Sequence, residues 1–248
     1  MIITKIILIL LLLISISMII YKYTITTKSN YLKPKPNKFS ILDFYSSFKT
    51  ILNILKEINI PYAFCYGTAL GFYRSNDFIP HDDDIDIMIK HSDLSKLGFQ
   101  TIQQQQKYIN NIATKYGLQG KYSTPHKGTP FLYTKNGKGM PILYQYMDTK
   151  TGLGIDFYVF YEDNDNNLWL FSEGGEYDYT GYKFSNTIGN YKKLNIHGIE
   201  ISVCPIQMII EEYGPNFMTP MKRDDPNYHS KQKEYYGEFP DKWLLPLI

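Results

Sequence analysis

The spacing of apolar residues divides the chain into helix-like and strand-like segments. Apolar residues recur every three or four positions over residues 41–58, which predicts an amphipathic helix that is capped by Ser40 and ends at Asn59. Short apolar runs between turn residues predict strands at 62–66, 85–89, 131–134, 141–147, 155–161 and 168–171, and a hairpin of 191–196 with 199–203. Further helices are predicted at 69–73, 92–116 and 206–213. The chain is therefore expected to combine helices with a β-sheet.

The N-terminal region is strongly apolar. Residues 6–20 contain two polar residues, Ser15 and Ser17, and the apolar stretch extends to residues 2–21, about 30 Å as a helix. We predict a transmembrane signal anchor at residues 1–22, which makes the protein a single-pass membrane protein with residues 2–21 in the lipid bilayer. A cleaved signal peptide is the alternative, because Ser15 and Ser17 frame a small-x-small cleavage site.

A basic, proline-containing stalk is predicted at residues 23–40. Its lysines favour a cytosolic body by the positive-inside rule, but such lysines also bind anionic headgroups. The side of the membrane therefore stays open, and the secretory pathway and a host membrane both fit.

The charge is unevenly distributed. Of the 26 basic residues among 248, six lysines lie in residues 1–40, where there is no carboxylate, so the remainder has 20 basic and 24 acidic residues. This net charge of −4 lacks the positive surface that nucleic acid requires, and no nucleic-acid partner is expected.

Four aspartates, Asp82, Asp83, Asp84 and Asp86, lead into the strand predicted at residues 85–89. In an extended segment alternate side chains share a face, so Asp82, Asp84 and Asp86 are expected on one face and Asp83 on the other. Carboxylates on one face repel each other unless a cation balances them. Oxygen ligands of this kind suit Mg²⁺ or Mn²⁺. The alternative is a solvated acidic turn.

Three further features accompany these aspartates. Gly67 and Thr68 lie where a strand turns into a helix, and such a turn lets a phosphate approach free N–H groups. Arg74 follows and could bind a phosphate with two hydrogen bonds; the alternative is a surface ion pair. Asp156 is a single aspartate inside an apolar run, for which the cation is one partner and a lysine another.

These motifs together resemble the LicD/fukutin family of phosphotransferases. The matching segments are GTALG at 67–71, Arg74, FIP at 78–80, DDDID at 82–86, IDF at 155–157 and the region 205–220. The resemblance covers roughly residues 45–220 and implies an α/β (α+β) fold in the catalytic domain 41–248, a nucleotidyltransferase-like mixed β-sheet flanked by helices. It implies that Asp84 and Asp86 are paired metal ligands, that Asp156 is the third carboxylate and that Asp82 is a further candidate ligand.

Two residues depart from the family pattern. His81 and Phe217 stand where the family commonly has tryptophan, which affects the expected packing of acceptor or nucleotide more than the metal ligands.

Members of this family use CDP-activated alcohols, such as choline or ribitol, to modify glycans. The resemblance thus implies a membrane-anchored, metal-dependent transferase that moves a phosphocholine-like or ribitol-phosphate-like group from a CDP-linked donor to a glycan hydroxyl. Asp84, Asp86 and Asp156 would be catalytic, and Gly67, Thr68 and Arg74 would hold phosphate oxygens. Three alternatives stay open: a nucleotidyltransferase that releases pyrophosphate, a metal-dependent glycosyltransferase with Asp84 and Asp86 as its DxD motif, and a catalytically inactive binding module.

Overall fold

The helices and strands described here lie in one unit, Phe39–Ile248. The structure, a computed structural model, describes residues 38–120, 131–133, 138–171, 180–185, 191–220, 232, 234–236 and 239–246. The helices are α2 (Ile41–Ile58), α3 (Tyr66–Ser75), α4 (His91–Leu94), α5 (Ile102–Lys115) and α6 (Ile206–Tyr213), with 3₁₀ turns η1 (Ser95–Leu97) and η2 (Asp241–Trp243). The strands are β1 (Ala63–Phe64), β2 (Asp84–Lys90), β3 (Leu118–Gly120), β4 (Phe131–Tyr133), β5 (Lys138–Pro141), β6 (Leu143–Asp148), β7 (Gly154–Glu162), β8 (Leu168–Phe171), β9 (Thr180–Phe184), β10 (Lys192–Ile196), β11 (Ile199–Val203), β12 (Glu234–Tyr235) and β13 (Leu245–Pro246).

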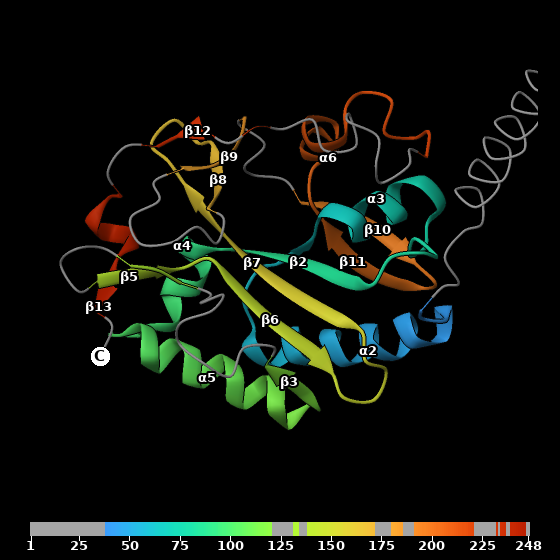
Figure 1. Ribbon diagram of the computed structural model, residues 1–248, viewed down its shortest axis with the longest axis horizontal. Helices are drawn as coiled ribbons and strands as arrows, with labels where there is room; N and C mark the ends of the chain where they lie inside the picture. The colour runs from blue at the N-terminus through green and yellow to red at the C-terminus, as the bar shows by residue number, and fades with distance from the viewer. Residues whose placement is uncertain are drawn as a thin grey trace, which may run out of the picture. The chain divides into compact units, whose positions relative to one another are not determined.

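Strand β7 lies at the centre of the main sheet. Within the described residues this sheet has the order β10-β11-β1-β2-β7-β8-β9-β12, and β6 joins β7 and β3 (Figure 1). Strand β2 is parallel to β7 and antiparallel to β1, so the sheet is mixed. A second, three-stranded sheet has the order β13-β5-β4. The predicted mixed sheet flanked by helices is confirmed.

The two faces of the main sheet differ in character. Helices α2 and α5 run along one side of the strands in Figure 1. On that side the ring of Phe48 in α2 lies 5.3 Å from that of Phe64 in β1, and the Tyr144 hydroxyl of β6 donates a hydrogen bond to Gln105 of α5 at 2.9 Å. Ile87 is paired with Phe64 and is fully buried. Because side chains alternate along a strand, Asp86 faces the opposite side of the sheet.

Helix α2 forms as its sequence predicts. Ser40 and Asp43 make reciprocal hydrogen bonds at its start: Asp43 N–H donates to Ser40 Oγ at 3.3 Å, and Ser40 N–H donates to Asp43 Oδ2 at 2.8 Å. At its end Asn59 adopts a left-handed conformation, with a φ of 56°. Both predicted ends are confirmed.

The single helix predicted at residues 92–116 is wrong. The structure divides this segment into α4, η1 and α5. Gly98 has a φ of 75°, which ends the first part, and the Thr101 hydroxyl accepts a hydrogen bond from the Gln104 N–H at 3.2 Å, which starts α5. These two capping signals divide a segment whose polar, glutamine-containing sequence favours one helix.

Other predicted boundaries also shift. The strand predicted at 62–66 is limited to β1, because helix α3 already starts at Tyr66 and not at residue 69. The strand predicted at 141–147 is confirmed as β6, which begins two residues later, at Leu143, and ends at Asp148. The hairpin β10–β11 and helix α6 are confirmed, whereas β3, β5, β9, β12 and β13 were not predicted.

The predicted membrane anchor at residues 1–22, and the stalk up to residue 37, lie outside the described residues. Among the helices that the structure does describe, none combines the length and the apolar character that crossing a bilayer requires. The anchor therefore stays a prediction.

His91 predicts a pH dependence of stability. Its ring, 6% exposed, stacks on Tyr161 at 4.7 Å, and burial lowers its pKa from 6.5 to about 4. Between these pH values the unfolded chain takes up a proton that the folded chain excludes, so stability falls as the pH falls. The free energy of unfolding should drop by about 2 kcal/mol from this group between pH 7 and pH 4.5.

The measurement is urea unfolding of the wild type and of His91→Gln at both pH values. Glutamine cannot take up a proton in this pH range. The free energy of unfolding of His91→Gln should therefore fall by about 2 kcal/mol less than that of the wild type between pH 7 and pH 4.5. An identical loss in the two proteins would show that His91 titrates normally.

Candidate functional site

Three neighbouring strands place polar side chains in one row across the sheet. Asp86 of β2 is the Cα partner of Asp156 of β7, and Asp156 is in turn the partner of Gln145 of β6. Paired residues point to the same face, so the three side chains share one face. Asp84 precedes this row and is paired with Gly154, where a Cβ would lie 3.0 Å from that of Asp84.

The carboxylates of Asp84, Asp86 and Asp156 converge. One oxygen from each lies within 4.8 Å of the other two. Asp86 and Asp156 are 5% and 4% exposed. Burial raises the pKa of Asp86 well above its usual value, and the charges of Asp84, Asp82 and Asp156 raise it further. The structure thus brings together the three predicted metal ligands.

This donor set fits a hard divalent cation. Three carboxylates in a largely buried site repel each other, and a cation removes the repulsion. Beside Asp156, the Oε1 atom of Gln145 is buried and accepts no hydrogen bond from the described part of the chain. An unsatisfied buried oxygen next to carboxylates is consistent with a site made for an ion and its ligands. Asp84, Asp86 and Asp156 would hold Mg²⁺ or Mn²⁺.

The start of helix α3 is fastened to Asp86. The Thr68 hydroxyl accepts a hydrogen bond from the Asp86 N–H at 2.9 Å, and the Thr68 N–H donates to Asp86 Oδ2 at 3.4 Å. Tyr66, the first residue of α3, has a φ of 44°, which is unfavourable for a residue with a bulky side chain. The chain accepts this strain where it turns sharply from β1 into α3, beside the carboxylates.

Gly67 leaves room for two carboxylates. A Cβ on this residue would lie 2.6 Å from Asp82 Oδ2 and 3.4 Å from Asp86 Oδ2. Gly67 and Thr68 lie inside the first turn of α3, which begins at Tyr66, and not before the helix as predicted. Thr68 is 1% exposed. Their contacts are with aspartates, and the predicted contacts with phosphate stay predictions.

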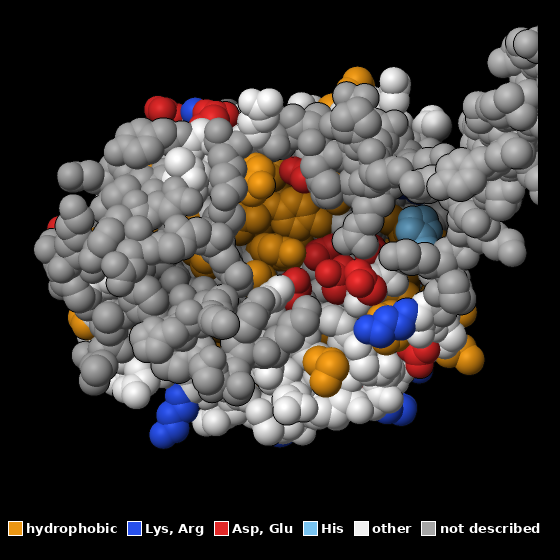
Figure 2. Space-filling model, in the orientation of Figure 1, with side chains coloured by type: hydrophobic (Ala, Val, Ile, Leu, Met, Phe, Trp, Pro, Cys, Tyr) orange, Lys and Arg blue, Asp and Glu red, His pale blue; other side chains and the backbone are white. Residues whose placement is uncertain are grey.

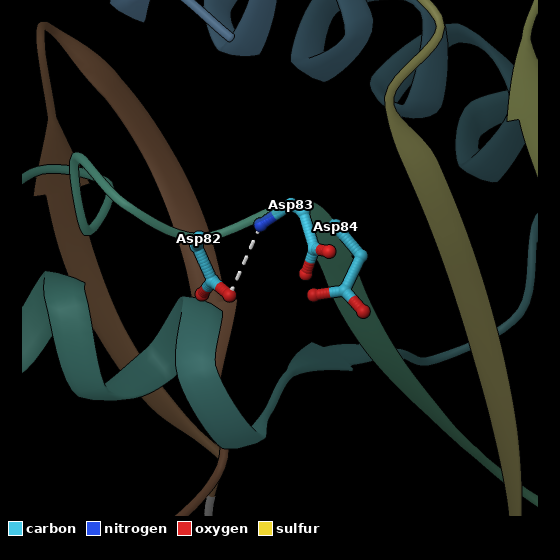
Figure 3. Close-up of side chains that lie close together, drawn as sticks. All are labelled: Asp82, Asp83 and Asp84. Atoms are coloured by element: carbon cyan, nitrogen blue, oxygen red, sulfur yellow. Dashed lines mark hydrogen bonds between the residues drawn. The ribbon is translucent and has the colours of Figure 1, made fainter. Parts of the chain in front are cut away.

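The side chains of Asp82, Asp83 and Asp84 form a second acidic group. Each contributes an oxygen within 4.8 Å of the others. Figure 3 shows the carboxylates of Asp83 and Asp84 close together and that of Asp82 next to α3. The prediction that Asp83 lies apart from its neighbours is wrong, because β2 begins at Asp84 and strand alternation does not extend to the two residues before it.

Arg74 makes contacts of another kind. Its Nε donates a hydrogen bond to the main-chain oxygen of Phe217, and its Nη2 donates to that of Thr219 at 3.3 Å. Arg74 lies in the last turn of α3, seven residues and about 10 Å of helix beyond Gly67. These contacts fasten the segment after α6 to α3, and the predicted phosphate contact of Arg74 stays a prediction.

Three residues near the carboxylates were missed by the sequence analysis: Tyr66, Tyr158 and Gln145. The rings of Tyr66 and Tyr158 meet edge to face at 5.0 Å. Burial raises the pKa of Tyr158 well above its usual value, and the charges of Asp86 and Asp156 add to the shift. Figure 2 shows a hollow lined by hydrophobic side chains beside a group of acidic ones. The available signal for Tyr158 was its position two residues after Asp156, on the same face of the strand.

A mixed sheet with paired carboxylates beside the start of a helix is the arrangement that the sequence resemblance implied. The family model described as LicD/FKTN/FKRP, nucleotidyltransferase domain, matches residues 59–203. The chain belongs to this family.

The chain is also similar to individual proteins of mouse and of a bacterium. Ribitol-5-phosphate transferase FKTN of Mus musculus is 27% identical over 175 residues, which cover 69% of this chain and 32% of that protein. Uncharacterized protein RT0683 of Rickettsia typhi is 32% identical over 89 residues, 36% of this chain and 28% of that protein. The chain thus spans about a third of the length of these relatives. Among solved structures, lincomycin-bound lincosamide antibiotic adenylyltransferase LnuA has a TM-score of 0.40 at 15% identity, covering 66% of this chain and 83% of that one.

A substitution at Gly67 tests whether the carboxylates need the space that this glycine leaves. In Gly67→Ala the new Cβ would displace the carboxylates of Asp82 and Asp86 and disturb the cation site. Adding Mn²⁺ should raise the midpoint of thermal unfolding of the wild type, because a ligand that binds the folded state stabilises it. This rise should be largely lost in Gly67→Ala.

The matched control is Gly120→Ala, because a Cβ at Gly120 meets nothing within 4 Å. It should keep the wild-type response to Mn²⁺. A full response in Gly67→Ala would mean that the carboxylates do not need this space.

Proposed function

We propose that this chain is a metal-dependent phosphotransferase that moves a phospho-alcohol from a CDP-linked donor to a glycan hydroxyl. The observation that carries the proposal is the convergence of Asp84, Asp86 and Asp156 beside the first turn of α3. Family membership and the similarity to the mouse ribitol-5-phosphate transferase support the class of reaction.

The three aspartates would bind one divalent cation and through it the diphosphate of the donor. The cation would neutralise the phosphate oxygens and stabilise the departing oxygen. Buried carboxylates are suited to this task, because the sheet fixes the positions of Asp86 and Asp156 and they would keep their places when substrate binds or leaves. The first turn of α3 adds a partial positive charge on the same side as Asp86.

The reaction would exchange one phosphorus–oxygen bond for another. The acceptor hydroxyl oxygen forms a bond to the phosphorus that carries the alcohol, the bond between this phosphorus and the oxygen of CMP breaks, and CMP leaves. The acceptor's proton passes to a carboxylate of the cluster. Asp82 is the candidate for this proton acceptor. It is half-buried at the edge of the cluster, and one of its carboxylate oxygens lies next to Gly67.

Anchoring to a bilayer through residues 2–21 belongs to the same proposal and rests on the sequence alone. A membrane-bound enzyme would act on glycans that are displayed or assembled at that membrane.

One alternative is favoured by a specific observation. The family model is described as a nucleotidyltransferase domain, and a nucleotidyltransferase would attack a nucleoside triphosphate and release pyrophosphate. The nature of the leaving group separates these two reactions.

The donor class is tested by incubating the full chain in detergent with Mn²⁺, a glycan acceptor and a panel of CDP-alcohols, including CDP-choline and CDP-ribitol. Chromatography should detect CMP with at least one donor, and chelation with EDTA should stop its release. Release of pyrophosphate from CTP, with no CMP from any CDP-alcohol, would support the nucleotidyltransferase alternative.

Asp84→Asn tests the assignment of the site. Loss of an outer partner of a metal ligand typically reduces activity 10–100-fold, so loss of a ligand itself should reduce CMP release by more than about a hundredfold. Because Asp84 is only half-buried, the variant should fold normally, and its circular dichroism spectrum should match that of the wild type. The matched control Asp165→Asn, on an exposed turn, should keep full activity. A fully active Asp84→Asn enzyme would refute the assignment.

A further inference from the structure

Gln145 is the polar neighbour of Asp156 on the side away from Asp86. It is the Cα partner of Asp156 across the antiparallel pair β6–β7. Its Nε2 atom donates a hydrogen bond to Asp156 Oδ2 at 2.8 Å. Asp156 cannot turn its carboxylate without breaking this hydrogen bond, so the amide fixes the direction in which the carboxylate oxygens point.

The other end of the same amide is costly to the fold. Gln145 Oε1 is buried and has no hydrogen-bond donor among the residues that the structure describes. A buried acceptor without a donor destabilises the folded state, and an apolar side chain of similar length would avoid this cost. An amide, however, cannot supply its N–H donor without its carbonyl oxygen. The unsatisfied Oε1 atom is therefore the consequence of having an amide as the neutral donor at position 145.

A neutral donor is the type that a cation site needs here. A lysine or arginine would also donate to Asp156, but its positive charge would oppose a divalent cation between the carboxylates. A glutamate would repel Asp156 and could not donate when ionised. Glutamine holds the carboxylate and leaves its negative charge available.

We propose that Gln145 is a positioning residue for the cation site, which keeps Asp156 turned toward Asp84 and Asp86. The inference rests on the proposed function in one respect, that a divalent cation binds these carboxylates. It adds a residue from a third strand, so that β2, β7 and β6 together determine the geometry of the site.

The test is calorimetric titration of Mn²⁺ into the full chain in detergent, after removal of bound metal with EDTA. Gln145→Met keeps the length and volume of the side chain but has no N–H to donate. Loss of such a partner typically weakens metal binding 10–100-fold, and the Kd for Mn²⁺ should rise by about that factor. The matched control is Gln119→Met on β3, where the glutamine is exposed, and its Kd should stay within about twofold of the wild type.

A second readout separates positioning from general structural damage. The Mn²⁺ concentration that gives half-maximal CMP release should rise by the same factor in Gln145→Met, whereas kcat at saturating Mn²⁺ should change much less. A damaged fold would lower kcat but leave the Mn²⁺ concentration for half-maximal CMP release unchanged. Such a result would count against the proposal.

Three outcomes decide the matter. A Gln145→Met protein that binds Mn²⁺ as the wild type does would overturn the positioning role and leave the proposed function intact. If that variant does not fold, Gln145→Asn replaces it, because its amide is one methylene too short to reach Asp156; wild-type affinity would again overturn the role. A wild type that binds no Mn²⁺ would overturn the cation-dependent function itself, and with it this inference.

Discussion

The in-register pairing of β2 with β7 is the constraint on which the site depends. This register puts Asp86 beside Asp156, two carboxylates that would repel each other in isolation. The alternate residues hold the register, because Ile85, Ile87 and Ile155 are fully buried on the opposite face. A slip of one residue would move the apolar set to the polar side and the aspartates into the core. The hydrophobic core thus provides the free energy that keeps the carboxylates together.

Helix α3 completes the arrangement at short range. Thr68 exchanges hydrogen bonds with Asp86, and Gly67 leaves space for the carboxylates above it. The left-handed conformation of Tyr66 lets the helix begin directly after β1. The two hydrogen bonds of Thr68 tie the first turn of α3 to Asp86, so the distance between the helix and this carboxylate is fixed. A rigid site of this kind would need little rearrangement to bind a cation.

Much of this arrangement was predictable from local sequence patterns. The apolar alternation after Asp84 gave the buried strand, and the single aspartate in an apolar run identified Asp156 as a residue that needs a partner. Gln145 could not be identified in this way, because its role comes from strand register between distant segments. Arg74 and Thr68 had suitable chemistry, but their hydrogen-bond partners are determined by how α3 packs. The division of the segment 92–116 was missed because Gly98 and Thr101 act through backbone geometry and capping.

We propose above that Asp84, Asp86 and Asp156 together bind one divalent ion. Crystals of the protein soaked in Mn²⁺ and measured at the manganese absorption edge locate such an ion directly by its anomalous scattering. If they do, one strong peak is expected at roughly 2 Å from an oxygen of each of the three carboxylates. A peak that contacts only Asp82 and Asp83, or no peak near Asp156 at saturating Mn²⁺, would contradict it.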